Sequence, residues 1–151
     1  MIKIICVGKL KEKYLKDALN EYKKRISKYT KLEIIELNDY NDKNTQIILS
    51  KEKQEIDKYI NRNDYIICLD IKGNMVTSEE LASKIDKIFI QNPCITFIIG
   101  GSYGIHEDIK KMSNELLSFS SLTFPHQLFR VMLLEQIYRV FKIQNNESYH
   151  K

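Results

Sequence analysis

Short apolar runs alternate with longer amphipathic segments along the whole chain. The strand-like runs cover residues 2–7, 32–37, 65–71 and 95–99. Apolar residues recur at helical spacing in residues 10–29, 45–60 and 78–91. Strands that alternate with helices pair in parallel, because each crossover helix returns the chain to the same edge of the sheet. The pattern predicts an α/β fold in which a mostly parallel sheet carries helices on both faces.

Local signals place the ends of several of these elements. Gly73 and Asn74 form a dipeptide typical of turns, so we expect the third strand to end before them. Thr77 and Glu80 have the spacing of a capping box, which predicts the start of a helix. In the second helix, Tyr59 is expected to face the core together with two isoleucines, Ile48 and Ile56.

The last third of the chain reads as a helix, an extended segment and a long final helix. Residues 106–117 are predicted to be helical, with His106 as a cap or surface residue, and residues 119–124 to form a short strand or extended loop. Pro125 fits the first turn of the final helix, where its missing N–H costs no hydrogen bond. That helix should extend to about residue 143.

Apolar residues occupy nearly every side of the final helix. They are Leu128, Phe129, Val131, Met132, Leu133, Leu134, Ile137, Tyr138, Val140, Phe141 and Ile143. Such a helix is buried on more than one side. A second subunit could supply one of the covering surfaces, so we expect a two-fold homodimer. Glu135 and Arg139 should form an i,i+4 ion pair on the remaining polar strip.

Composition indicates a single globular domain spanning residues 1–151. Hydrophobic residues make up 43% of the 151 positions, and no run approaches the roughly 20 apolar residues of a membrane span. The first residues read as a strand rather than a signal peptide, so we expect a cytoplasmic protein. The three cysteines, Cys6, Cys68 and Cys94, lie in apolar runs without metal-ligand spacing. We expect buried thiols, with neither a disulfide framework nor a metal site.

Positive charge is concentrated near the start of the chain. Residues 9–31 contain nine basic and three acidic side chains, whereas the whole chain has a net charge of +4. Clustered lysines are typical of surfaces that bind phosphate groups. A solvated helix face rich in lysine has the same composition, so this feature alone leaves both interpretations open.

A neutral segment near the final helix contrasts with the rest of the chain. Residues 116–129 contain no Asp, Glu, Lys or Arg, although 29% of all residues are charged. The segment is core and helix start, or it encloses a flat ligand such as adenine with backbone groups and apolar side chains. An uncharged pocket also suits methyl transfer from a sulfonium, whose positive charge disappears as the methyl group leaves.

Ligands of parallel α/β sheets bind at the carboxyl ends of the strands. Three segments should meet there: LDIKG at 69–73, GGSYG at 100–104 and FSSLTFPH at 119–126. None of them matches a phosphate loop or a dinucleotide-binding fingerprint. The glycines of GGSYG permit either a close approach of backbone to ligand or a tight strand-to-helix turn.

The order LDIKG, FIIGGSYG, LSFSSLTFPHQLFRVMLLEQIYRVFKI and a terminal YHK resembles the ribosomal RNA large subunit methyltransferase H family. That family belongs to the SPOUT class of methyltransferases, and the resemblance covers the whole chain. It implies a C-terminal deep trefoil knot, an obligate homodimer and S-adenosylmethionine as cofactor. The implied reaction is methylation of N3 of a pseudouridine in large-subunit (23S) rRNA on the assembled ribosome, without a metal.

The resemblance also implies which residues form the site. The implied cofactor-binding residues are Leu69, Gly100, Phe119, Ser120, Ser121, Leu122, Thr123 and Phe124. His126 and Arg130, one helical turn apart, are expected to orient the substrate and stabilise negative charge on the imide. Tyr149 and His150 in the tail are expected to act at the rRNA base. Alternatively, Arg130 pairs with a helix carboxylate, His126 caps the helix, and the tail is frayed.

Three other functions are compatible with parts of the pattern. A non-catalytic ribosome-binding factor would use the same basic surface without binding S-adenosylmethionine. A SPOUT enzyme that acts on tRNA would share the fold and the cofactor. A flavodoxin-like binder of small molecules would share the sheet, although the absence of a phosphate loop weighs against it. Calorimetry with S-adenosylmethionine separates the enzymes from the ribosome-binding factor.

Overall fold

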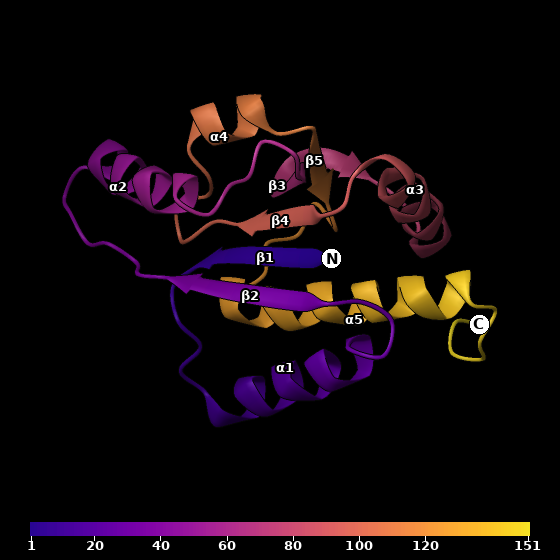
Figure 1. The fold of residues 1–151 in the computed structure, drawn as a ribbon. Helices are drawn as coiled ribbons and strands as arrows, with labels where there is room; N and C mark the ends of the chain where they lie inside the picture. The colour runs from indigo at the N-terminus through magenta and orange to yellow at the C-terminus, as the bar shows by residue number, and fades with distance from the viewer.

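Five parallel strands form one sheet in the order β2-β1-β4-β3-β5 (Figure 1). The computed structural model describes residues 1–151. The strands are β1 (Ile2–Val7), β2 (Leu32–Leu37), β3 (Tyr65–Met75), β4 (Ile95–Ile99) and β5 (Glu115–Ser118). The predicted α/β fold with a parallel sheet is confirmed.

Helices cover both faces of this sheet. They are α1 (Lys13–Ile26), α2 (Thr45–Asp57), α3 (Ser78–Gln91), α4 (Glu107–Met112) and α5 (His126–Gln144). The larger core lies between the sheet and α1, α3 and α5, and the smaller one lies beneath α2 and α4 on the other face (Figure 1). None of the helices combines the length and apolar character that a membrane crossing requires.

The final helix is buried within its own chain. Leu133, Leu134, Ile137 and Val140 of α5 have no exposed surface, because α1 and α3 pack along the helix while the sheet covers a further side (Figure 1). Neighbours within the same chain cover much of α5, although Leu128 remains 40% exposed. The homodimer stays a prediction. The expected Glu135–Arg139 ion pair is confirmed at 2.5 Å.

The fifth strand lies where the sequence predicted a helix. Helix α4 ends at Met112, and residues 115–118 form β5 instead of continuing the helix to residue 117. Asn114 sets this change, because its backbone N–H donates to the carbonyl of Ile66 at 2.9 Å and its side-chain oxygen accepts from the N–H of Ile66 at 2.8 Å. Both bonds tie the chain to β3, so a tertiary contact overrides the local helical pattern.

The third strand continues through the predicted turn. Gly73 and Asn74 lie within β3. The strand is irregular between Leu69 and Asn74, and Leu69 and Asn74 both align with Leu117 of β5. A Cβ atom on Gly73 would lie 2.6 Å from the backbone nitrogen of Leu117. The glycine is thus required by the close approach of two strands and not by a turn.

Among the predictions for single residues, most are confirmed and one is wrong. Thr77 and Glu80 form the expected capping box, and His106 caps α4 by accepting from the N–H of Asp108 at 3.0 Å. All three cysteines are buried thiols. Tyr59 is 42% exposed, because α2 ends at residue 57, so its predicted inward orientation is wrong.

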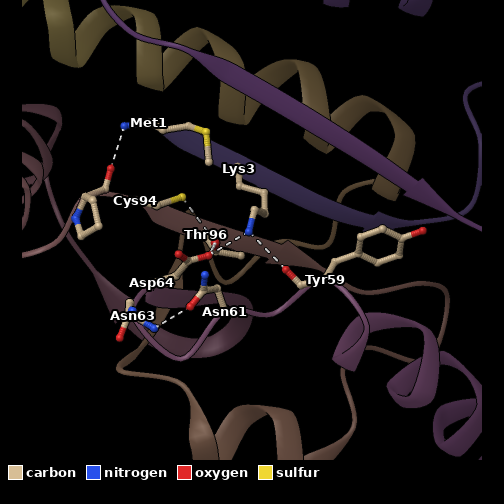
Figure 2. A network of polar contacts seen from close by, with 9 residues as sticks. Met1, Lys3, Tyr59, Asn61, Asn63, Asp64, Cys94 and Thr96 are labelled. Atoms are coloured by element: carbon tan, nitrogen blue, oxygen red, sulfur yellow. Dashed lines mark hydrogen bonds and ion pairs between the residues drawn. The ribbon is translucent and has the colours of Figure 1, made fainter.

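A buried ion pair connects strands near their amino ends. The ammonium of Lys3 on β1 lies 2.9 Å from a carboxylate oxygen of Asp64, which also accepts a 2.7 Å hydrogen bond from Thr96 on β4. Lys3 further donates to the backbone carbonyl of Tyr59 at 3.2 Å (Figure 2). This network fixes β1 against β4 and the segment before β3 at the edge of the sheet opposite to the strands' carboxyl ends.

Replacing Gly73 by alanine tests the close approach of β3 and β5. The new Cβ would meet the backbone of Leu116 and Leu117 at 2.6–2.7 Å, so the strands must separate. We expect Gly73→Ala to lower the free energy of unfolding by about 3 kcal/mol, measured by urea denaturation. Lys72→Ala, at an exposed neighbouring position, is the matched control. Equal losses in the two variants would contradict the packing described.

Candidate functional site

A cavity of about 680 Å³ lies at the carboxyl end of β4, beside β3 and β5. Its walls come from residues 69–71, from the glycine turn after β4 and from the loop that joins β5 to α5. These are the three segments that were expected to meet at the carboxyl ends of the strands. The volume falls within the range of cofactor and small-molecule sites.

The neutral loop between β5 and α5 is held together by its own hydroxyls and rings. Ser118 donates its hydroxyl proton to the carbonyl of Ser120 at 3.0 Å, and the hydroxyl of Ser120 accepts from the N–H of Leu122 at 3.0 Å. The ring of Phe119 packs on that of Phe129 with centroids 4.8 Å apart. Side-chain oxygens thus satisfy the loop's backbone, while the rings attach the loop to the first turn of α5.

Seven of the eight expected cofactor residues line this cavity. They are Leu69, Gly100, Phe119, Ser120, Leu122, Thr123 and Phe124. Ser121, the eighth, is exposed outside the lining. The structure therefore brings together most of the predicted cofactor residues from three separate parts of the chain.

The glycine turn after β4 is shaped mainly by its own backbone. A Cβ on Gly100 would lie 2.3 Å from the carbonyl oxygen of Gly104, and Gly104 itself has a φ of +83°. The N–H of Gly104 closes the turn by donating to Gly101 at 3.1 Å. Of the two interpretations left open by the sequence, the tight turn is the one that requires Gly100.

A second cavity, of about 370 Å³, adjoins the same loop on its other side. Both cavities are lined by Ser118, Phe119 and Phe124. The remaining wall comes from the start of α3 and from α5, including Glu135. No motif in the sequence predicted this cavity, although Thr77 of the capping box lies in one of its walls.

His126 is a titratable residue of α5 that also lines the first cavity. It is the first residue of α5, and Pro125 holds the cap position without a side-chain hydrogen bond, so the capping role considered for His126 is wrong. Burial, followed by the positive charges of Arg130 and Lys11, lowers the pKa of His126, and the carboxylate of Asp39 opposes this shift only in part. This shift favours the neutral form of the imidazole.

The Arg130 side chain is buried and bonded to residues of the fold. Its guanidinium is 1% exposed and donates to the carbonyls of Val7 and Gly8 at 2.7 and 2.6 Å. It also pairs with Glu36 of β2 at 2.8 Å. The geometry supports the structural alternative, with a strand carboxylate in place of the expected helix carboxylate. We therefore treat Arg130 as a positioning residue rather than a group that contacts substrate.

The C-terminal tail folds against its own chain beside the second cavity. The hydroxyl of Tyr149 donates to Glu135 at 3.1 Å, and the guanidinium of Arg139 lies 4.8 Å from the centre of the Tyr149 ring. A ring nitrogen of His150 lies 2.7 Å from Glu79 at the start of α3. Both side chains are half-buried, so the frayed tail considered from sequence is not what the structure has. Within one chain, Tyr149 and His150 do not line the same cavity as His126.

One buried carboxyl near the site was missed by the sequence predictions. Glu52 of α2 is 5% exposed, and one of its oxygens would lie 3.2 Å from a Cβ on Gly101. Burial, and secondarily the charge of Asp39, raise the pKa of Glu52 to about 7. The signal was present in the sequence, because Glu52 lies midway between Ile48 and Ile56 at i,i+4 spacing on the buried face of α2.

The pH dependence of stability tests this burial. The folded-state pKa of Glu52, about 7, exceeds the ordinary value of 4.5, so the folded protein loses stability as rising pH removes the proton. Glu52→Gln should therefore gain stability relative to the original protein as pH rises from about 4.5 to above 7, reaching about 3 kcal/mol. Glu33→Gln, at an exposed carboxylate, is the control. Urea denaturation across this range measures both, and a difference independent of pH would contradict the assignment.

Comparison with known proteins agrees with this geometry. A family model described as "Predicted SPOUT methyltransferase" matches residues 1–150. A Clostridium botulinum (strain Alaska E43 / Type E3) protein named "Ribosomal RNA large subunit methyltransferase H" is 55% identical, over 99% of each chain. A Caldicellulosiruptor saccharolyticus protein with the same name is 47% identical over the full length of both.

Solved structures share the fold at low sequence identity. A probable methylase family protein from Haemophilus influenzae matches with a TM-score of 0.60 at 12% identity, covering 99% of this chain and 70% of that one. The tRNA (m1G37) methyltransferase of Aquifex aeolicus matches with a TM-score of 0.56 at 13% identity, covering 92% and 69%. With full-length relatives at about half identity and a matching family model, the chain belongs to the ribosomal RNA large subunit methyltransferase H family of SPOUT methyltransferases.

Proposed function

We propose that the protein transfers a methyl group from S-adenosylmethionine to N3 of a pseudouridine in large-subunit rRNA, on the assembled ribosome. The observation that carries the proposal is the cavity at the carboxyl end of β4, lined by most of the residues at which the family resemblance implies cofactor binding. The names of the full-length relatives support large-subunit rRNA as the substrate.

The cavity fits the cofactor in size and in charge. Aromatic rings and backbone groups of the β5–α5 loop offer flat apolar walls for an adenine. Asp70 is the carboxylate in the lining, and its charge is balanced by Lys110 at 2.7 Å. S-adenosylmethionine supplies a methyl group activated by a positively charged sulfur. The positive charge on sulfur disappears in the transition state. A wall without a free countercharge therefore does not stabilise the ground state more than the transition state.

The basic segment offers a surface for rRNA on α1. Lys16, Lys23, Lys24 and Lys28 are exposed, whereas Lys13 and Arg25 are occupied by ion pairs with Asp17 and Glu21. Exposed lysines that neutralise phosphates release counterions, which gives affinity that falls with salt. This surface supports ribosome binding as part of the proposal.

Further parts of the proposal rest on the family resemblance. They are a homodimer and a deep trefoil knot around the β5–α5 loop. One domain over residues 1–151 and a cytoplasmic location are proposed from the composition of the chain. Tyr149 and His150 are proposed to contact the rRNA base. Their position beside the second cavity supports a role near the loop, and a homodimer would allow the tail of one subunit to serve the first cavity of the other.

Activity on tRNA is the second candidate, favoured by the fold shared with the Aquifex aeolicus enzyme. That likeness is at 13% identity, and relatives near 50% identity carry the rRNA name, so rRNA is preferred. A non-catalytic ribosome-binding factor is the third candidate, and it differs from the other two in transferring no methyl group.

Transfer of labelled methyl groups to purified ribosomes tests the proposal. We expect the full-length protein to label large-subunit rRNA, with the label in N3-methylpseudouridine after digestion to nucleosides. Removing residues 149–151 should lower the rate about a hundredfold, or about 2.7 kcal/mol of transition-state stabilisation, with little change in S-adenosylmethionine affinity. Label in tRNA instead would establish the second candidate, and ribosome binding without transfer the third. Equal rates of full-length and truncated protein would exclude the tail from the site.

A further inference from the structure

We propose that His126 is the proton acceptor of the methyl transfer, taking the proton from the imide nitrogen that is methylated. The inference rests on the proposed function and adds to it the destination of the proton. It assigns His126 a role opposite to the one expected from the sequence, in which a cationic group would stabilise an imide anion.

Geometry places this imidazole at the site and limits its movement. His126 lines the first cavity together with Gly100 and Thr123. On its other side the ring lies against Gly8, where a Cβ would be 3.4 Å from the ring nitrogen Nε2. Gly8 is itself held by Arg130, which donates to its carbonyl at 2.6 Å. The imidazole is thus packed against the residue that follows β1 and also belongs to the lining of the cavity.

Charged groups on three elements act on this ring. Arg130 lies one turn further along α5, Lys11 belongs to the loop before α1, and Asp39 follows β2. Burial and the two cations disfavour the imidazolium, and Asp39 favours it. The amino end of α5 also disfavours a positive charge at its first residue. Together they lower the pKa of His126 from its ordinary 6.5, which favours the neutral ring that can accept a proton.

The chemistry of an imide requires such a base. The N–H bond of N3 breaks and its proton moves to an imidazole nitrogen, while the N3 electron pair forms the bond to the methyl carbon. The electron pair of the broken carbon–sulfur bond stays on sulfur, which becomes a neutral thioether. The imidazolium then releases its proton to water, a step that the nearby Arg130 and Lys11 favour. All atoms and charges balance without a further reactant.

Other titratable groups near the cavity fit this role less well. Glu52 does not line the cavity, and burial raises its pKa to about 7, so much of it is already protonated at neutral pH. Arg130 is a permanent cation and is enclosed by the fold. Tyr149 and His150 are bound to Glu135 and Glu79 beside the second cavity.

The test compares the original protein with His126→Asn and Asp39→Asn. His126→Asn should bind S-adenosylmethionine within about threefold of the original affinity and lower kcat/KM on ribosomes about a hundredfold. The original protein should lose activity as pH falls below its His126 pKa. In His126→Asn this acid limb of the pH–rate profile should be absent. The rate should instead keep rising with pH, because the imide must then ionise without a base. Asp39→Asn removes the charge that favours the imidazolium, so it should move the limb to lower pH.

Titration of the free protein by NMR gives a readout independent of activity. The His126 ring should titrate below 6.5, and lower still in Asp39→Asn. An active original protein whose acid limb persists in His126→Asn, or whose His126 titrates at or above 6.5, would overturn this inference alone. An original protein that binds S-adenosylmethionine but labels no ribosomal imide would overturn the proposed function and this inference together. His126→Gln provides a second folded variant should His126→Asn fail to bind the cofactor.

Discussion

A single buried guanidinium connects the final helix to the edge of the sheet where the cavities lie. Arg130 of α5 donates to the carbonyls of Val7 and Gly8 at the end of β1 and pairs with Glu36 of β2. The same carboxylate oxygen of Glu36 accepts from the N–H of Leu10 at 2.8 Å. Because the guanidinium is 1% exposed, leaving its charge without these partners would be unfavourable, so this contact fixes the start of α5 relative to two strands.

The position of the site follows from that connection. Because α5 runs antiparallel to the sheet, its first turn lies at the carboxyl edge (Figure 1). Arg130 holds this turn, Phe129 packs on the ring of Phe119 in the preceding loop, and His126 is brought against Gly8. Without the guanidinium, neither the loop nor the imidazole would have a fixed place beside the glycine turn after β4. Arg130 thus acts on the site through the residues it holds.

Local sequence determined most elements but not those set by tertiary contacts. The apolar runs of β1, β2 and β4 and the capping box of α3 were predicted with their observed bounds, because burial and capping are local signals. The fifth strand was expected at residues 119–124 and lies at 115–118, because its leucines continue a helical pattern and only the bonds of Asn114 to Ile66 redirect the chain. Gly73 was misread for a similar reason, since its requirement arises from β5 and not from its neighbours in sequence.

The same distinction holds for the site. Three segments distant in sequence were expected at the carboxyl ends of the parallel strands, and the cavity lies between them. The enclosure of Arg130 and the docking of His150 on Glu79 depend on partners far away in sequence, which periodicity does not reveal. Helices α1 and α3 of the same chain cover much of α5, and the apolar pattern of α5 does not distinguish this cover from that of a second subunit.

The central claim is that the loop between β5 and α5 forms the pocket for the methyl donor. Calorimetry with S-adenosylmethionine on the original protein, Leu122→Lys and Ile90→Lys tests it most directly. Leu122 lines the cavity and is 71% exposed, whereas Ile90 is 78% exposed at the far end of α3. The account predicts binding by the original protein and Ile90→Lys, and at least tenfold weaker binding by Leu122→Lys, about 1.4 kcal/mol, because an ammonium there repels the sulfonium. Equal affinities of all three proteins, or no binding by the original, would contradict it.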